Sequence, residues 1–200
     1  MTNLRKLVVT AMLIALCVVL PMAFHAIPRA GAIILPMHIP VLLAGLICGW
    51  KFGLIAGVAG PFLSSVLTGM PPMGIANLMM IELGVYGMVA GILAERVHTK
   101  IASLDLYISL VGAMLVGRVV AGIAQAMYFF GGGFFAARYA DGVYSTYTLA
   151  IWTASYFVTS LPGIVIQLAF IPSVVLALER ERVIPLRYPL LAEGHSVHMR

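Results

Sequence analysis

Long apolar runs alternate with short polar or Gly/Pro segments along most of the chain, and these runs predict membrane-spanning helices. About 18 or more apolar residues cross roughly 30 Å of hydrocarbon as a helix. The second and third runs are short and glycine-rich and meet at "CGWKFG", which predicts a tight turn at Trp50-Lys51. In the last run, "SLPG" at Ser160–Gly163 predicts a bend. We expect spans near residues 5–24, 36–50, 52–69, 75–95, 104–130 and 148–178.

Composition supports the same class of protein. Hydrophobic residues make up 62% of the 200 residues and charged residues only 10%, against about 25% charged in soluble domains. Cys17 and Cys48 lie inside apolar runs without metal-type spacing, so we expect buried small side chains and no disulfide. The N-terminal segment has the charged start and apolar centre of a signal peptide, but no convincing A-x-A cleavage site follows, and we interpret it as the first span. The prediction is an all-α integral membrane protein, a six-transmembrane-helix bundle.

The basic residues indicate the orientation of these spans. Cytoplasmic loops of membrane proteins carry an excess of Lys and Arg. With the N-terminus inside, Arg29 and Arg138 fall outside, and a larger set falls on the cytoplasmic side: Arg5, Lys6, Lys51, Arg96, Lys100, Arg180, Arg182 and Arg187. Both termini are then cytoplasmic, with a membrane domain over residues 1–182 and a tail over 183–200. This placement explains the basic excess without a nucleic-acid partner.

Two external segments are candidate lids in this topology. They are "HAIPRAGAII" between the first two spans and "GGGFFAARYADGVYST" before the last span. Loops that close over a ligand often have this placement on a rigid scaffold.

Three polar groups are predicted to lie at one depth inside the membrane. Counting about 1.5 Å per residue from the cytoplasmic ends puts Glu82, Arg118 and Gln167 roughly 17–21 Å above the inner boundary. A carboxylate at that depth costs about 2.5 kcal/mol or more, and a nearby Arg118 lowers this cost. The pair is either a structural salt bridge or the floor of a pocket that opens outward. In a third alternative, Arg118 clamps a carboxylate or phosphate of a ligand.

Further polar side chains are candidates for the wall of such a pocket. His38 opens the second span and is either a ligand contact or a solvated anchor. Tyr86, one turn from Glu82, is either its hydrogen-bond partner or a packing residue. Thr159 is placed in the outer half of the bundle with several of the candidates. The predicted substrate-binding residues are Glu82, Arg118, Asn77, Gln125, His38, Tyr86, Trp152, Tyr156 and Gln167.

Small residues recur at four-residue spacing, which lets helix backbones approach closely. The first span has Ala11-x-x-x-Ala15, and the fourth has Gly87-x-x-x-Gly91. A longer series, Gly45, Gly49, Gly53 and Gly57, runs through the second and third spans. Internal packing is expected to account for most of these patterns.

Motifs for nucleotide hydrolysis and for soluble catalysis are absent from the sequence. It contains no Walker motif, HExxH or GxSxG. An intramembrane enzyme using Glu82 and His38 is the weakest reading, because no second catalytic carboxylate or metal-ligand set accompanies them. We therefore expect no enzymatic activity, no cofactor and no metal site.

The chain resembles the S components of energy-coupling factor (ECF) vitamin transporters in its six spans and in two sequence segments. These are "AMLIA" in the first span and "LPMHIPVLLAGLICGWKFGLIAGVAGPFLSSVLTGMPP" in the next two. The resemblance implies that Ala11 and Ala15 pack against a membrane coupling subunit, which carries two ABC-type ATPases. It implies capture of a vitamin or related micronutrient from outside, with the first external segment as a gate, in a bacterial cytoplasmic membrane. "PMHIPVLLAG" looks most like members for pantothenate, pyridoxine-type or cobalamin-precursor uptake. A self-contained carrier that takes up a proton at Glu82 is the alternative.

Overall fold

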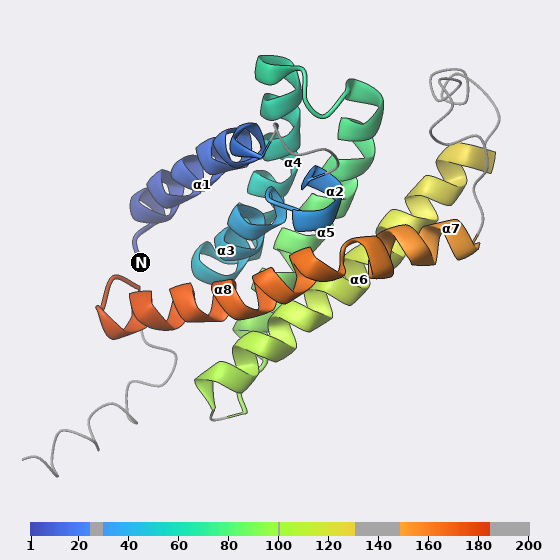
Figure 1. The fold of residues 1–200 in the computed structure, drawn as a ribbon. Helices are drawn as coiled ribbons and strands as arrows, with labels where there is room; N and C mark the ends of the chain where they lie inside the picture. Colours follow the sequence, from blue (N-terminus) through green and yellow to red (C-terminus); the bar gives the residue numbers. More distant parts are fainter. Residues whose placement is uncertain (25–29, 100, 131–148, 185–200) are drawn as a thin grey trace, which may run out of the picture.

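The computed structural model describes residues 1–24, 30–99, 101–130 and 149–184, and every regular element in these ranges is helical. Figure 1 shows the order of the helices along the chain. They are α1 (Asn3–Ala23), α2 (Ala30–Ile34), α3 (His38–Cys48), α4 (Trp50–Thr68), α5 (Met73–Arg96), α6 (Ala102–Phe130), α7 (Leu149–Thr153), a π-helix (Ala154–Thr159) and α8 (Leu161–Arg180). The predicted all-helical class is confirmed for the described residues.

Five of these helices are long and apolar enough to cross a membrane: α1, α4, α5, α6 and α8. The second predicted span is different, because α3 has only 11 residues and measures about 16 Å at 1.5 Å per residue. It is shorter than the hydrocarbon layer and begins at His38, two residues later than expected. The described residues therefore contain five spanning helices by length, together with one short buried helix.

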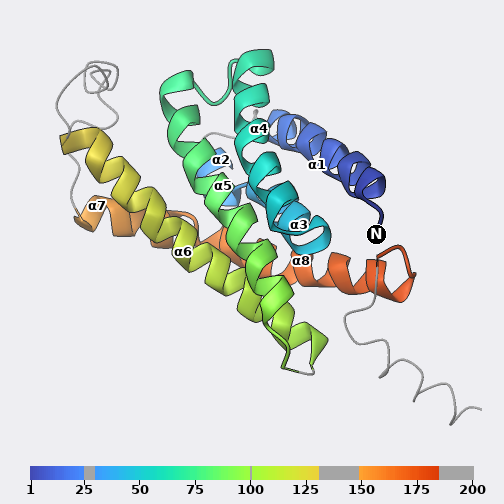
Figure 2. The same cartoon turned by 180° about the vertical axis from the view of Figure 1, so that it is seen from behind.

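The short helix α3 lies at the centre of the molecule. It packs against α1, α4, α5 and α8, and the opposite views in Figures 1 and 2 show it enclosed by these helices. Leu42, Leu43 and Leu46 on α3 join the main core with Tyr86 on α5 and Leu110 on α6. An apolar helix enclosed by protein on several sides contributes core packing instead of a lipid-facing surface.

A glycine seam joins α3, α4 and α5. A Cβ atom at Gly45 or Gly53 would collide with the carbonyl group of Gly87, and one at Gly91 would collide with the backbone of Trp50. The helix break between α3 and α4 falls at Gly49, whose φ of 95° favours glycine, one residue before the predicted turn. The expectation that internal packing explains the glycine spacing is confirmed for this seam.

The outward faces of the long helices are apolar. Large hydrophobic side chains are exposed along α1, α4, α6 and α8, among them Met12, Phe62, Leu115, Ile123, Val165 and Phe170. Such continuous apolar exposure on a soluble protein would mark an interaction surface. On a chain with five helices of spanning length, it marks the surface that faces lipid. Cys17 and Cys48 are both buried and unpaired, as expected.

The last predicted span is interrupted. The π-helix ends at Thr159, and α8 starts at Leu161 with Pro162 in its first turn, close to the predicted bend. Single π-helical segments are rare and occur often at functional sites. The chain remains packed just past α8, where Ile184 is buried against the core. The predicted lid segments around Arg29 and residues 131–144, and most of the predicted tail, lie outside the described residues.

Candidate functional site

The carboxylate predicted inside the membrane is buried on α5. Glu82 is 8% exposed, and its Oε1 lies 3.6 Å from Nε2 of His38 at the start of α3. His38 is itself 3% exposed, so the solvated-anchor interpretation is wrong. The geometry brings an acid and an imidazole from two helices together, at a distance too long for a hydrogen bond.

Arg118 on α6 does not form the ion pair predicted from the sequence. Its Nη1 donates a hydrogen bond of 2.9 Å to Oγ of Ser160, which lies between the π-helix and α8. The Ser160 hydroxyl in turn donates to the carbonyl oxygen of Tyr156. Among the described residues of this region, Glu82 lies within ion-pair distance of His38. No described acidic side chain lies within that distance of Arg118. Helical depth predicted a common level but not the direction of the side chains around each axis.

Tyr86 connects the His38 side of this region with α6. It is fully buried, and its ring meets the His38 ring edge-on with centroids 5.1 Å apart. The Tyr86 hydroxyl has no hydrogen-bond partner among the described residues, so the predicted bond to Glu82 is not made. Gly117 on α6 provides the room for the ring, because a Cβ atom there would lie 2.9 Å from it.

Aromatic side chains from the last span surround the guanidinium of Arg118. The Arg118 Cζ lies 5.4 Å from the ring centroid of Phe157 and 6.0 Å from that of Tyr156. Trp152 packs against both rings, at centroid distances of 5.6 and 6.0 Å. Aromatic faces attract cations, and more strongly away from water. The π-helix thus places Tyr156 and Phe157 where they hold the cation of the neighbouring helix.

Unpartnered polar atoms mark this region. Within the described residues, five buried side-chain atoms lack a hydrogen-bond partner: His38 Nδ1 and Nε2, Tyr86 Oη, Gln125 Oε1 and Trp152 Nε1. All belong to residues predicted from the sequence as substrate-binding. Leaving a buried donor or acceptor unpaired costs about 1–3 kcal/mol. We call His38, Glu82, Tyr86, Arg118, Gln125, Trp152, Tyr156, Phe157 and Ser160 the polar cluster.

Three residues predicted to line the pocket do not join the polar cluster. Asn77 is exposed, because it lies five residues before Glu82 and so points to a different side of α5. Gln167 is buried, but its amide donates to the carbonyl oxygen of Leu35 at 3.4 Å. Thr159 has no contact with the cluster among the interactions described. Gln167 therefore fixes the start of α3 to α8.

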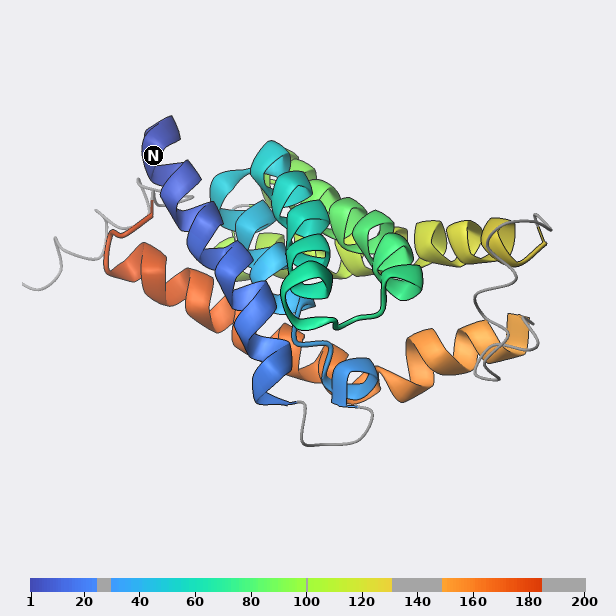
Figure 3. The ribbon, with the colours of Figure 1, turned by 90° about the horizontal axis from the view of Figure 1, so that it is seen from above.

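The segment before α3 is held against α8 at a second point. A Cβ atom at Gly163 would lie 2.7 Å from the carbonyl oxygens of Ile33 and Ile34. Leu35, which follows, has a positive φ of 54°, a conformation uncommon outside glycine. This backbone turn directs its carbonyl to Gln167. The view in Figure 3 shows α2 beside the junction between the π-helix and α8.

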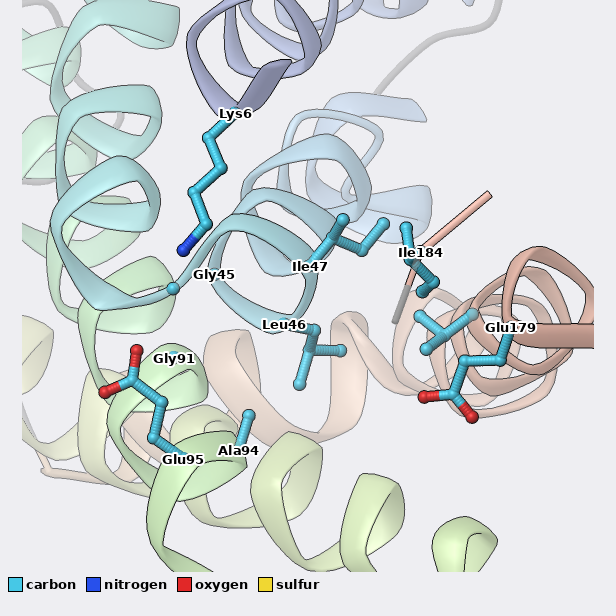
Figure 4. A pocket seen from close by; sticks show the side chains of 11 residues that line it. Lys6, Gly45, Leu46, Ile47, Gly91, Ala94, Glu95, Glu179 and Ile184 are labelled. Atoms are coloured by element: carbon cyan, nitrogen blue, oxygen red, sulfur yellow. The ribbon is translucent and has the colours of Figure 1, made fainter. Parts of the chain in front are cut away.

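A cavity of about 190 Å³ lies at the other end of the molecule. It is bordered by the start of α1, the α3–α4 junction and the ends of α5 and α8, with Lys6, Glu95 and Glu179 as its charged residues. Figure 4 shows Lys6 and Glu95 pointing toward each other beside Gly45. None of the predicted substrate-binding residues borders it. The cavity is therefore separate from the polar cluster.

The small residues of the first span do not pack inside the molecule. Ala11 and Ala15 are exposed on α1, whereas Leu13 and Cys17 face the core. The Ala-x-x-x-Ala face is thus unlike the glycine seam, where every small residue meets a neighbouring backbone.

A comparison with known families gives the context for this geometry. The family model described as "ECF transporter, substrate-specific component" matches residues 5–175. The chain belongs to this family. The match covers α1 through most of α8 and includes the whole polar cluster. No curated protein and no solved structure matches the chain.

Membership makes the chain a substrate-specific component, the subunit of an ECF importer that provides substrate binding. It is a multi-pass membrane protein and a transport subunit, and a small-molecule substrate and an ECF membrane and ATPase module follow from the family. Two residues of its polar cluster were missed by sequence reasoning. Ser160 was considered only as part of a bend, and Phe157 only as part of an apolar run. The one sequence feature that could have indicated these two residues is their position next to the predicted bend in the last span.

Proposed function

We propose that this substrate-specific component captures a vitamin or related micronutrient from outside the cell and delivers it inward while partner subunits hydrolyse ATP. Pantothenate, a pyridoxine-type compound and a cobalamin precursor are the substrates we favour. The proposed membrane is the bacterial cytoplasmic membrane, with both termini in the cytoplasm. Glu82, Arg118, His38, Tyr86, Gln125, Trp152 and Tyr156 are the proposed binding residues, with Asn77 and Gln167 kept as more distant candidates.

The buried polar atoms of the cluster carry this proposal. An unpaired hydrogen-bonding group costs free energy in every state of the protein in which it stays dry and unpaired. A ligand that pairs these atoms offsets the cost when it binds. The groups come from α3, α5, α6 and the last span, as expected for a pocket between helices of a bundle.

The exposed alanines support docking to a coupling subunit. Ala11 and Ala15 lie one turn apart and leave a flat strip on which another helix can pack closely. Two helix ends on this side of the molecule support the orientation, because the first turn of α1 carries Arg5 and Lys6 and the last turn of α8 carries Arg180. Basic residues favour the cytoplasmic side.

A self-contained proton-coupled carrier is the competing function. The contact between His38 and Glu82 is the observation that favours it, since two titratable groups meet inside the membrane. The two functions differ in their energy source. One needs ATP and the partner subunits, and the other needs only a proton gradient.

Reconstitution distinguishes the two functions. We expect purified protein in proteoliposomes to bind labelled micronutrients but to transport them only with the complete module and ATP. Ala11→Trp should leave binding intact and abolish uptake, because the indole separates the helices. Ala169→Trp is the matched control, since Ala169 is also exposed, on α8, and should retain uptake. Transport by the chain alone, driven by a proton gradient, contradicts the proposal.

A further inference from the structure

Arg118 is a buried cation that has no acidic partner among the described residues. It is 3% exposed, and the described residues give it one hydrogen bond, to the neutral hydroxyl of Ser160. The guanidinium has five N–H donors in a planar fork suited to a carboxylate. A buried charge is normally paired or coordinated. The part of the chain that the structure describes therefore does not provide Arg118 with a carboxylate, the group that its guanidinium is best suited to bind.

Glu82 does not fill that role. Its carboxylate lies toward His38, at 3.6 Å, while the ring of Tyr86 contacts His38 on one side and lies against Gly117, the residue before Arg118, on the other. The polar cluster thus divides into an acidic end at His38 and Glu82 and a basic end at Arg118. At the basic end, the described side chains beside the guanidinium are the aromatic rings of Tyr156 and Phe157 and the hydroxyl of Ser160.

The neutral groups of the cluster extend from this basic end. Gln125 lies seven residues after Arg118 on the same face of α6, about 10 Å further along the axis. Gly122 lies between them, and a Cβ atom there would collide with the indole of Trp152. The Trp152 N–H can only donate, whereas the Gln125 amide can donate and accept. These groups match hydroxyl or amide groups of a ligand about as long as this spacing.

From these observations, and resting on the proposed binding function, we infer that Arg118 binds the carboxylate of a small monocarboxylic acid that also carries hydroxyl or amide groups. The carboxylate lies in the fork of the guanidinium, next to Ser160. The hydroxyl or amide groups pair with Trp152, Gln125 and Tyr86. The aromatic rings of Tyr156 and Phe157 cover the ion pair and exclude water from it.

A single negative charge fits the cluster better than a phosphate ester. A phosphate monoester carries about −1.5 to −2 charges at pH 7. Arg118 is the one residue of the polar cluster with a permanent positive charge. A dianion would leave charge uncompensated in a medium of low dielectric constant. The first experiment therefore tests whether the bound ligand carries a carboxylate or a phosphate.

The first experiment identifies the bound chemistry. Purified protein is incubated with a defined mixture of water-soluble vitamins and their precursors, washed and denatured, and the released compounds are analysed by mass spectrometry. Methyl esterification counts carboxyl groups by mass. We expect one carboxyl group and no phosphorus. A bound compound with a phosphate, or without a carboxyl group, overturns this inference and leaves the binding function standing. Release of nothing above a heat-denatured control overturns both.

The second experiment assigns the carboxylate to Arg118. The recovered acid and its neutral methyl ester are compared on wild type, Arg118→Gln and the exposed control Arg96→Gln. Removing one partner of a buried charge pair is expected to weaken binding of the acid on the order of 100-fold. The wild type and Arg96→Gln should prefer the acid by that factor, and Arg118→Gln should bind both forms with similar affinity.

Two further measurements keep the test informative if Arg118→Gln fails to fold. The acid-to-ester ratio needs only wild-type protein, and a ratio near one overturns the inference. Ser160→Ala retains the cation but removes the hydroxyl that orients it, so the acid should bind about 10-fold more weakly. An unchanged acid preference in a folded Arg118→Gln protein would also contradict the assignment.

Discussion

Two opposite faces of α5 have contrasting roles. Gly84, Gly87 and Gly91 lie on one face, and the backbones of α3 and α4 approach it so closely that no side chain fits at Gly87 or Gly91. Glu82 and Tyr86 lie on the other side, about 100–180° around the helix from these glycines, and meet His38 and the region of Arg118. One helix therefore has a seam at which Gly87 and Gly91 meet neighbouring backbone, and a face made of charged and polar groups.

The difference shows how a small membrane protein positions a polar site. At the glycine seam, van der Waals contact between backbones holds α3, α4 and α5 in one arrangement. The polar face, in contrast, has buried atoms without partners within the described residues. A rigid support is what a binding site with unpaired groups needs, since those groups must keep their positions before the ligand arrives. The seam supplies rigidity and the polar face supplies recognition.

Adding one methyl group to the seam should have the largest effect on stability. Gly87→Ala places a Cβ atom against the carbonyl group of Gly53, and backbone cannot move aside as a flexible side chain can. We expect a loss of about 3 kcal/mol or more, at the upper end for overpacking, seen as aggregation in detergent and a lower melting temperature. Gly74→Ala is the control, because nothing lies within 4 Å of a Cβ atom there. Equal melting temperatures for the two variants would show that the helices of the seam can move apart to accommodate the added methyl group.

Much of this contrast could be predicted from sequence. Apolar runs located α1, α4, α5 and α6 to within a few residues, and the glycine spacing indicated close packing. The length of α3 could not be predicted, because a short helix enclosed by protein and a short spanning helix have the same apolar pattern.

The membership of the polar cluster was only partly predictable. Charge and depth selected Glu82 and Arg118, since an ionisable group in an apolar run needs an explanation. Their partners depend on rotation about each helix axis and on the π-helix, which shifts the positions of Tyr156 and Phe157. Counting residues along the sequence gives neither the rotation about each helix axis nor the position of the π-helix. It therefore predicted an ion pair where the structure has Arg118 bonded to Ser160.

A methyl group at the border of the polar region should have an intermediate effect. Gly163→Ala would push against the carbonyl oxygens of Ile33 and Ile34 and move α2 away from α8. We expect the compound recovered from the vitamin mixture to dissociate about 10-fold faster, since residence time depends on the contacts that close over a ligand. The melting temperature should fall less than in Gly87→Ala, because α2 mainly touches α8 and the π-helix.

The matched control for this variant lies on α2 itself. A Cβ atom at Gly31 would have nothing within 4 Å, so Gly31→Ala should leave dissociation unchanged. Equal dissociation rates for Gly163→Ala and Gly31→Ala would mean that the contact between α2 and α8 does not retain the ligand.

The smallest expected effect separates the two ends of the polar cluster. Double-mutant cycles with Glu82→Gln, Arg118→Gln and His38→Gln measure coupling through the free energy of unfolding in detergent mixtures. Residues in direct contact couple by about 0.5–3 kcal/mol. Glu82 lies 3.6 Å from His38, whereas Arg118 donates to Ser160 and has no acid within ion-pair distance among the described residues. The coupling of Glu82 with His38 should therefore exceed its coupling with Arg118. The reverse order would restore the direct ion pair predicted from the sequence, and it would remove the reason for Arg118 to require an anion from a ligand.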